Sequence, residues 1–327
     1  MGGRPPQLLA LENATAGRIG EFGGRGLPSA RSSADESGRV LEESRSVADA
    51  PAFRVDVYAR AMDILGRLAR ELEDPAPHLA HRIRWQRQRR KDPGIAAISH
   101  LLPTGGCGVD VGAARGMYSV GMLAATGRHG LVHAFEPNPA NAARLRKIAR
   151  RKRTLVLHQV ALSAESGTAE FMVPVVDGVA YEGMGSLEDP SRSVSAELQR
   201  FAVPMARLDD VLGDAPRIDM IKIDVEGHED AVLAGATAVL DKHGPSILIE
   251  LEHRHRGNDP RPTMDMLVER GLTGWAVFPD GLRPIEAFDP QEHQLRFLDR
   301  DHGQIMPPGY VTDFLFTREN VDALRAS

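Results

Sequence analysis

The stretch with the clearest chemical content is residues 108–116, which reads Gly-Val-Asp-Val-Gly-Ala-Ala-Arg-Gly. A short apolar strand carries Asp110 at its end, Gly112 follows, and an apolar helix begins after Gly116. Ligands of open α/β sheets bind outside the carboxyl ends of strands. A glycine there lets a ligand approach the main chain closely, and the helix start offers unpaired N–H groups. The pattern therefore predicts a ligand-binding turn, with a simple tight connection as the alternative.

The position of the acids indicates which ligand binds. A dinucleotide site has Gly-x-Gly-x-x-Gly after the strand, so that pyrophosphate lies on the helix N-terminus. Here Asp110 precedes the glycines; it would repel pyrophosphate but suits the cationic amino group of S-adenosylmethionine (SAM). The next apolar segment ends in Glu136, about 20 residues beyond the loop, where an acid can bind a ribose diol. We therefore predict SAM rather than NAD, bound by Asp110, Gly112, Gly116 and Glu136.

A second cluster of titratable residues follows the apolar segment 218–223. Within six residues the chain carries Asp224, Glu226, His228 and Glu229. Burying unpaired charges is unfavourable, so these side chains should face a cleft above the sheet, where their pKa values can be tuned. The plainer alternative is that Glu226 and Glu229 only stabilise a helix N-terminus.

These residues require a sheet that brings strand ends together. We expect strands at residues 108–111, 131–135, 155–160, 218–223, 246–251 and 273–278. We expect helices at about 116–126, 138–150, 228–242 and 261–271, the second capped by Asn138. This alternation predicts an α/β fold with a doubly wound, mostly parallel sheet.

Two segments interrupt the alternation. Residues 168–173 and 201–208 read as extended, and residues 175–200 between them read as a loop that could cover the acceptor. Residues 310–316 are expected to complete an antiparallel pair at the sheet edge with 273–278. Residues 281–308 read as a loop over the cleft.

Motifs along residues 105–252 resemble the FkbM family of SAM-dependent methyltransferases. The matching segments are residues 110–118, 134–139, 161–163, 208–209, 221–236 and 249–250. The most specific is Ile-Asp-Val-Glu-Gly-His-Glu at 223–229. One departure is Ala114, where the family usually has asparagine. That change removes a side-chain hydrogen bond near the cofactor.

The resemblance implies a Rossmann-like class I methyltransferase that methylates a hydroxyl of a sugar, polyketide or other small metabolite. It adds Ala113, Tyr118, Pro137, Ala161 and Asp224 to the predicted cofactor-binding residues. Methyl transfer in line needs an aligned oxygen and removal of its proton. Histidine titrates near neutral pH, so His228 is the candidate base, with Asp224 and Glu226 as further catalytic candidates.

A divalent metal is a less favoured possibility. Asp224 with Glu226 or Glu250 could hold Mg²⁺, which prefers oxygen ligands and would acidify the acceptor hydroxyl. Glu250, Glu252, His253 and His255 follow a predicted strand and could also line the acceptor cleft. Lys222, inside a strand, is expected to pair with a neighbouring acid.

The domains predicted from composition are a disordered segment at 1–50, a helical extension at 51–103 and the methyltransferase domain at 104–327. The extension contains an amphipathic helix at 53–73 and a basic run at 82–91, whose Ile83 and Trp85 should pack inward. A second basic run lies at 144–153. A nucleic-acid methyltransferase using these two runs, and a non-catalytic SAM-binding protein, are the alternative functions.

Charge and composition narrow the other options. The net charge of −5 argues mildly against a dedicated nucleic-acid binder. The single cysteine, Cys107, permits no internal disulfide and no multi-cysteine zinc site. The sequence has no apolar run of transmembrane length and no signal peptide, so we expect a cytoplasmic protein without membrane contact, acting on a small-molecule acceptor.

Overall fold

The computed structural model describes residues 68–69, 71–72, 75–89, 91–189, 196–298 and 309–325. All of them belong to one compact unit, residues 52–327. The predicted disordered segment and most of the helix expected at 53–73 lie outside the described residues; at the end of that helix, Leu68, Ala69 and Glu71 are helical.

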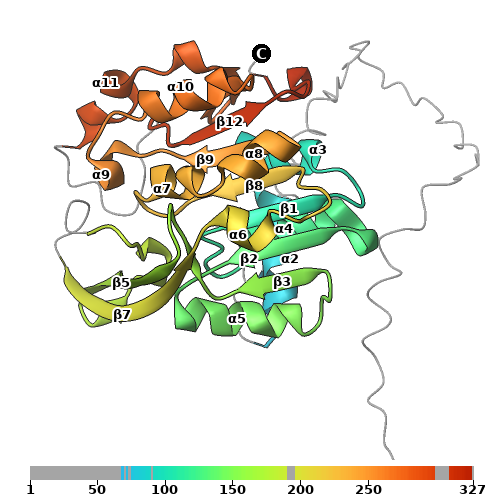
Figure 1. Ribbon diagram of the computed structural model, residues 1–327, viewed down its shortest axis with the longest axis vertical. Coiled ribbons are helices and arrows are strands. Elements are labelled where there is room, and N and C mark those ends of the chain that lie inside the picture. Colours follow the sequence, from blue (N-terminus) through green and yellow to red (C-terminus); the bar gives the residue numbers. More distant parts are fainter. Residues whose placement is uncertain are drawn as a thin grey trace, which may run out of the picture. The chain divides into compact units, whose positions relative to one another are not determined.

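An eight-stranded sheet forms the centre of this unit, with strand order β11-β10-β12-β9-β8-β1-β2-β3 (Figure 1). Five neighbouring strands are parallel: β1 (Cys107–Val111), β2 (Leu131–Phe135), β3 (Leu155–His158), β8 (Met220–Ile223) and β9 (Ser246–Glu250). The other three are β10 (Thr273–Phe278), β11 (Gly281–Pro284) and β12 (Asp313–Thr317). β12 is antiparallel to both β9 and β10, and β11 forms a hairpin with β10.

Helices cover both faces of the sheet (Figure 1). They are α2 (Pro77–Gln88), α3 (Pro93–Leu101), α4 (Met117–Thr126), α5 (Pro139–Ala149), α6 (Leu208–Leu212), α7 (Glu229–Ala234), α8 (Thr237–His243), α9 (His253–Arg256), α10 (Arg261–Glu269) and α11 (Pro290–His293). One buried apolar cluster joins the sheet to α2, α3, α4 and α5, and a second joins it to α6, α7, α8 and α10. None of the helices described here combines the length and the apolar character needed to cross a membrane.

The predicted strand and helix alternation is confirmed, with three differences. The helix expected at 228–242 is two helices that break at Gly235, where a Cβ would lie 2.0 Å from the carbonyl oxygen of Ser163. The strand at the chain's end, β12, lies inside the sheet rather than at its edge. The segment predicted as a loop at 281–308 contains β11 and α11. Asn138 caps α5 as expected, its side chain accepting from the Ala140 amide at 2.9 Å.

A second, four-stranded sheet interrupts the alternation where the sequence analysis placed the break. Its strands are β4 (Ala161–Leu162), β5 (Gly167–Val176), β6 (Val179–Ala180) and β7 (Glu197–Ala206), in the order β4-β7-β5-β6. Figure 1 shows β5 and β7 as a long curved antiparallel pair. The loop predicted at 175–200 was therefore wrong at both ends, and its residues 190–195 lie outside the described part.

Candidate active site

A pocket opens where β1, β2 and β8 end. Its volume, counted together with the solvent at its open mouth, is about 580 Å³. Segments from both sheets line it: Val111, Gly112, Ala114, Phe135–Pro137, Val160–Leu162, Phe171, Glu182, Gly183, Gly185, Leu187, Asp224–Glu226 and His228. The pocket thus brings together seven predicted site residues: Gly112, Glu136, Pro137, Ala161, Asp224, Glu226 and His228.

The turn between β1 and α4 lies on one side of the pocket. Gly112 has a φ of +73°, and a Cβ there would lie 1.8 Å from the carbonyl oxygen of Asp224. Gly116 caps α4 with a φ of +95°, and a Cβ there would lie 2.6 Å from a methyl group of Leu145. Both positions therefore require glycine, and the first packs directly on the segment after β8.

Glu136 extends from the end of β2 to this turn. Its Oε2 accepts from the Ala114 amide at 2.7 Å and its Oε1 from the Asn138 amide at 2.8 Å. Burial raises the pKa of Glu136 to about 8, although both amide hydrogen bonds favour the carboxylate. Each carboxylate oxygen can accept a second hydrogen bond. Glu136 can therefore accept from a diol while keeping its backbone contacts.

Asp110 is fully buried and does not line the pocket. Its Oδ2 accepts from the Ser119 hydroxyl at 2.5 Å, whereas its Oδ1 is buried without a hydrogen-bond partner in the described part of the chain. Burial raises the pKa of Asp110, against the opposing charge of Lys222. Three other predicted cofactor residues, Ala113, Gly116 and Tyr118, also lie outside the pocket lining.

The turn after β8 begins with Asp224. Lys222, 3% exposed, lies with its Nζ 2.5 Å from Asp224 Oδ2, which is the ion pair expected for this strand lysine. Burial opposes ionisation of Asp224, but Lys222 and a hydrogen bond with Glu250 together hold its pKa below the usual range. Burial raises the pKa of Glu250 well above its ordinary value, and the Asp224 charge adds to this. A protonated Glu250 can therefore donate a hydrogen bond to the Asp224 carboxylate.

Glu226 is held by residues that the sequence analysis had placed in the cleft. Its backbone is left-handed, with a φ of +56°, and its Oε2 lies 2.9 Å from His255 Nε2. The same nitrogen is 3.2 Å from Glu252 Oε2. Burial lowers the pKa of His255, but these two carboxylates outweigh it and raise the pKa to about 10. His255 thus pairs with both Glu226 and Glu252, and neither His255 nor Glu252 lines the pocket.

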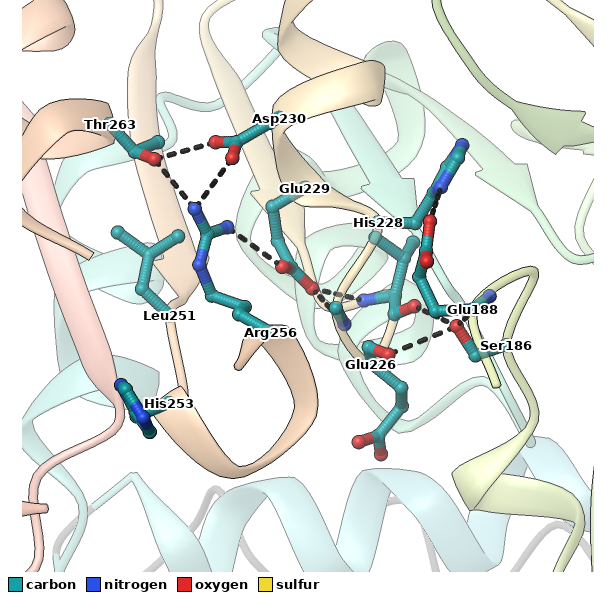
Figure 2. A network of polar contacts seen from close by, with 12 residues as sticks. Ser186, Glu188, Glu226, His228, Glu229, Asp230, Leu251, His253, Arg256 and Thr263 are labelled. Carbon is teal, nitrogen blue, oxygen red and sulfur yellow. Dashed lines mark hydrogen bonds and ion pairs between the residues drawn. The ribbon is translucent and has the colours of Figure 1, made fainter. Parts of the chain in front are cut away.

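His228 lies at the start of α7, and Figure 2 shows its ring turned toward Glu188. Nδ1 is 2.9 Å from Glu188 Oε1, and Nε2 is 3.0 Å from the Ser163 hydroxyl. The sequence analysis missed Glu188, which stands alone in the segment before β7 with no motif to mark it.

Glu229 is buried and does not line the pocket, and its carboxylate belongs to the network of polar contacts around Arg256 (Figure 2). Its Oε1 accepts from the Gly227 amide at 2.9 Å, and its Oε2 pairs with Arg256 at 3.1 Å. Arg256 also contacts Asp230 at 2.7 Å and Thr263 at 2.8 Å. Glu229 therefore fixes the backbone of the turn.

The residues considered for a metal do not assemble into a metal site. Lys222 already pairs with Asp224, and His255 already pairs with Glu226. Across the described residues, no three His, Cys, Asp or Glu side chains form a group that could hold a metal ion.

The first basic run packs as expected for a helix with one apolar side. Trp85 is 2% exposed and lies against α4, where a Cβ on Gly121 would be 2.2 Å from its ring. Ile83 is half-buried and Arg82 is exposed. In the second run, Arg144 pairs with Glu182 at the pocket.

Comparison with known proteins extends these findings. The methyltransferase FkbM domain model matches residues 110–290. The 2-O-methyltransferase NoeI of Sinorhizobium fredii is 36% identical over 117 residues, covering 33% of this chain and 48% of NoeI. The hexuronic acid methyltransferase AglP of Haloferax volcanii is 29% identical over 145 residues, covering 43% of this chain and 54% of AglP. The chain therefore spans about half the length of these curated relatives.

Among solved structures, methyltransferase FkbM from Methylobacillus flagellatus KT matches with a TM-score of 0.42 and 17% identity, covering 79% of this chain and 59% of that one. The family model alone spans more than half of the sequence. On that match, the chain belongs to the FkbM family of SAM-dependent methyltransferases.

Proposed function

We propose that this methyltransferase transfers the methyl group of SAM to a hydroxyl oxygen of a sugar. The observation that supports this most directly is that Glu136 and His228 line one pocket, the first suited to a diol and the second to a proton. The names of NoeI and AglP, a 2-O-methyltransferase and a hexuronic acid methyltransferase, support a sugar acceptor.

The groups around the first turn fit SAM. Glu136 would accept hydrogen bonds from the ribose hydroxyls, and the main chain at Gly112 lines the same pocket. The unpartnered Oδ1 of Asp110 is a buried acceptor beside this turn, and it can attract a cationic amino group. When bound, SAM supplies an electrophilic methyl carbon attached to a positively charged sulfur.

The residues of the second turn would align and deprotonate the acceptor. His228 takes the proton of the hydroxyl that is methylated. Lys222 holds the pKa of Asp224 low, and His255 pairs with Glu226. Both carboxylates line the pocket and can accept hydrogen bonds from neighbouring hydroxyls. A sugar carries several hydroxyls on one ring. These hydroxyls can donate hydrogen bonds to the carboxylates that line the pocket.

Calorimetric titration of S-adenosylhomocysteine tests the cofactor part of the proposal. The wild type should bind with a dissociation constant in the range of about 1–100 μM. Glu136→Gln and Asp110→Asn should each weaken binding, whereas Glu165→Gln, an exposed acid in the turn before β5, should not. Repeating the titration with EDTA tests for a metal. A wild type that fails to bind would overturn the assignment.

The acceptor is tested by transfer of a labelled methyl group from SAM to a panel of neutral sugars, uronic acids and non-sugar alcohols. Product should form with at least one sugar, and His228→Gln should lower turnover by about 10²- to 10⁴-fold, the usual contribution of a general base. Transfer only to non-sugar alcohols would contradict the sugar proposal while leaving the O-methyltransferase intact.

A nucleic-acid acceptor is the second candidate, because α2 and α5, the helices that carry most of the two basic runs, contact each other. Burial lowers the pKa of His78 in α2, and the charges of Arg151 and Lys152, just after α5, lower it further. A surface of this kind would bind RNA in a strongly salt-dependent manner. Fluorescence anisotropy with a labelled RNA at about 50 and 200 mM salt decides between the candidates, since the sugar enzyme should bind weakly at both.

A further inference from the structure

His228 is the centre of a three-residue chain assembled from separate segments. Ser163 follows β4, Glu188 precedes β7, and His228 opens α7. The Nε2 atom is 3.0 Å from the Ser163 hydroxyl, and Nδ1 is 2.9 Å from Glu188 Oε1. The His228 side chain is 15% exposed and Ser163 is buried, so the ring is held at both nitrogens in a largely enclosed place.

The chemistry of the three groups selects one arrangement of protons. An ionised carboxylate can only accept a hydrogen bond, so Nδ1 must carry the proton that it shares with Glu188. In a neutral imidazole the other nitrogen then has a free lone pair. The Ser163 hydroxyl, which can donate, satisfies that lone pair. The contacts therefore favour the Nδ1–H tautomer, with Nε2 as the basic atom.

We propose that Glu188 is a positioning residue for the methyl-transfer reaction, which fixes His228 in the tautomer and orientation that make Nε2 the general base. This inference rests on the proposed function, because it takes His228 as the base. Turnover then requires the acceptor hydroxyl to replace the Ser163 hydroxyl as the hydrogen-bond partner of Nε2.

The segment that carries Glu188 is itself anchored to the turn that carries His228. Ser186 is 2% exposed, and its hydroxyl lies 3.1 Å from the carbonyl oxygen of Val225 and 3.0 Å from that of Glu226 (Figure 2). The Glu188 amide donates to the same hydroxyl at 3.0 Å. Ser186 also pairs with Met172 of β5 through both backbone groups. Glu188 is therefore held close to His228 even though its side chain is 43% exposed.

His228 accepts one proton in the proposed methyl transfer. The O–H bond of the acceptor breaks and its proton goes to Nε2, while the acceptor oxygen forms a bond to the methyl carbon. The electron pair of the broken carbon–sulfur bond remains on sulfur. The imidazolium formed at His228 is stabilised by Glu188, which keeps its contact with Nδ1–H. Nε2 afterwards returns its proton to water.

The tautomer can be observed without cofactor or acceptor, in long-range ¹H–¹⁵N spectra of the histidine side chains of the full chain. The chain has 12 histidines, so His228→Gln identifies the signal. We expect His228 as Nδ1–H in the wild type and in Ser163→Ala, because Glu188 sets the tautomer. In Glu188→Ala the signal should move toward Nε2–H. A wild-type Nε2–H signal, or one unchanged in Glu188→Ala, would overturn the inference.

Kinetics with the active acceptor then separate positioning from a structural role. Glu188→Ala should lower kcat about 10- to 100-fold with KM values changed less than about twofold, because a misdirected base impairs the transition state more than binding. Glu188→Gln should recover most of this rate, since its carbonyl oxygen can still accept from Nδ1–H. Glu197→Ala, which removes an exposed acid at the start of β7, is the matched control and should behave as wild type.

The two measurements fail in different ways. Full activity of Glu188→Ala, or a Gln variant as slow as the Ala variant, would remove the positioning role. If no acceptor is methylated, the proposed function fails, while the tautomer experiment still reports on the Glu188–His228 contact. Loss of S-adenosylhomocysteine binding in Glu188→Ala would indicate a structural role instead.

Discussion

The two strand-to-helix turns of the pocket use the backbone in similar ways but offer different chemistry. Both leave a buried parallel strand and both contain left-handed residues, with Gly112, Ala114 and Gly116 in the first and Glu226 and Gly227 in the second. The turns are also in direct contact, since the amide after β8 donates to the last carbonyl of β1 at 3.1 Å.

The difference lies in what each turn presents to the pocket. The first turn presents main-chain groups, and the carboxylate beside it, Glu136, comes from the end of the neighbouring strand β2. The second presents side chains, and a partner holds each of Asp224, Glu226 and His228. The first turn should therefore be sensitive to added atoms, and the second to lost charges.

Lys222→Met should have the largest effect on stability. The substitution keeps much of the side-chain volume but leaves Asp224 without its buried counter-ion, and breaking such a pair typically destabilises by about 3–5 kcal/mol. Urea denaturation of both proteins measures the difference. Lys152→Met, at an exposed lysine after α5, is the control and should change little. A loss below about 1 kcal/mol would show that the second turn does not depend on this charge.

Gly112→Ala should be next, and it adds a single carbon to the first turn. A left-handed alanine costs about 1–2 kcal/mol, and the clash with the Asp224 carbonyl about 1–3 kcal/mol more. Gly178→Ala separates the two terms, because Gly178 has a φ of +76° but open space around its Cβ position. Equal losses for both variants in denaturation curves would contradict the close contact between the turns.

The contrast also explains what the sequence could reveal. The parallel strands were predictable because each is a short apolar run, such as Val109 to Val111, followed by a helix with its own start signal, such as Asn138. The first turn was predictable because left-handed backbone favours glycine, and glycine is visible in the sequence. The long β5–β7 pair was only partly predicted, because the glycines and the proline between the two strands, Gly178, Gly183, Gly185 and Pro190, suggested a loop over all of 175–200.

The second turn was harder, because its function depends on contacts between distant positions. The cluster 224–229 was recognisable in the sequence. Its partners were not, because Glu188, which contacts His228, lies 40 residues before it, and His255, which contacts Glu226, lies 27 residues after His228. No local motif marks either residue as a partner. Asp110 shows the opposite case. Its spacing suggested a pocket residue, whereas the side chain points into buried surroundings toward Ser119.

The pH dependence of cofactor binding tests the role of Glu136, the carboxylate beside the first turn. With the pKa of Glu136 raised to about 8 by burial, most of the empty protein has a neutral carboxyl at pH 6 to 7. If the ribose diol requires the carboxylate, affinity for S-adenosylhomocysteine should rise with pH, by at most about tenfold per unit, until about pH 8. Calorimetry from pH 6 to 9 should give a flat profile for Glu136→Gln.

The free energy of unfolding should fall as the pH rises from 4.5 to about 8. A carboxyl with a raised pKa stabilises the folded state while it is protonated in both states, below its ordinary value of 4.5, and this contribution is lost as the pH rises to about 8. Without cofactor, the unfolding free energy of the wild type should therefore fall more steeply than that of Glu136→Gln. Parallel curves for the two proteins would contradict the raised pKa.

The smallest effect is expected at Ala114, where the first turn has a side chain in a left-handed conformation, with a φ of +46°. Asparagine adopts this conformation more readily than alanine, and the amide that donates to Glu136 would be retained. Ala114→Asn should therefore raise stability by about 0.5–1 kcal/mol, seen as a melting temperature about 2 °C higher. Ala164→Asn, at an exposed position without a positive φ, should have no such effect. A lower melting temperature for Ala114→Asn would mean that the pocket wall leaves no room for the amide, so that packing rather than backbone strain limits the residue at 114.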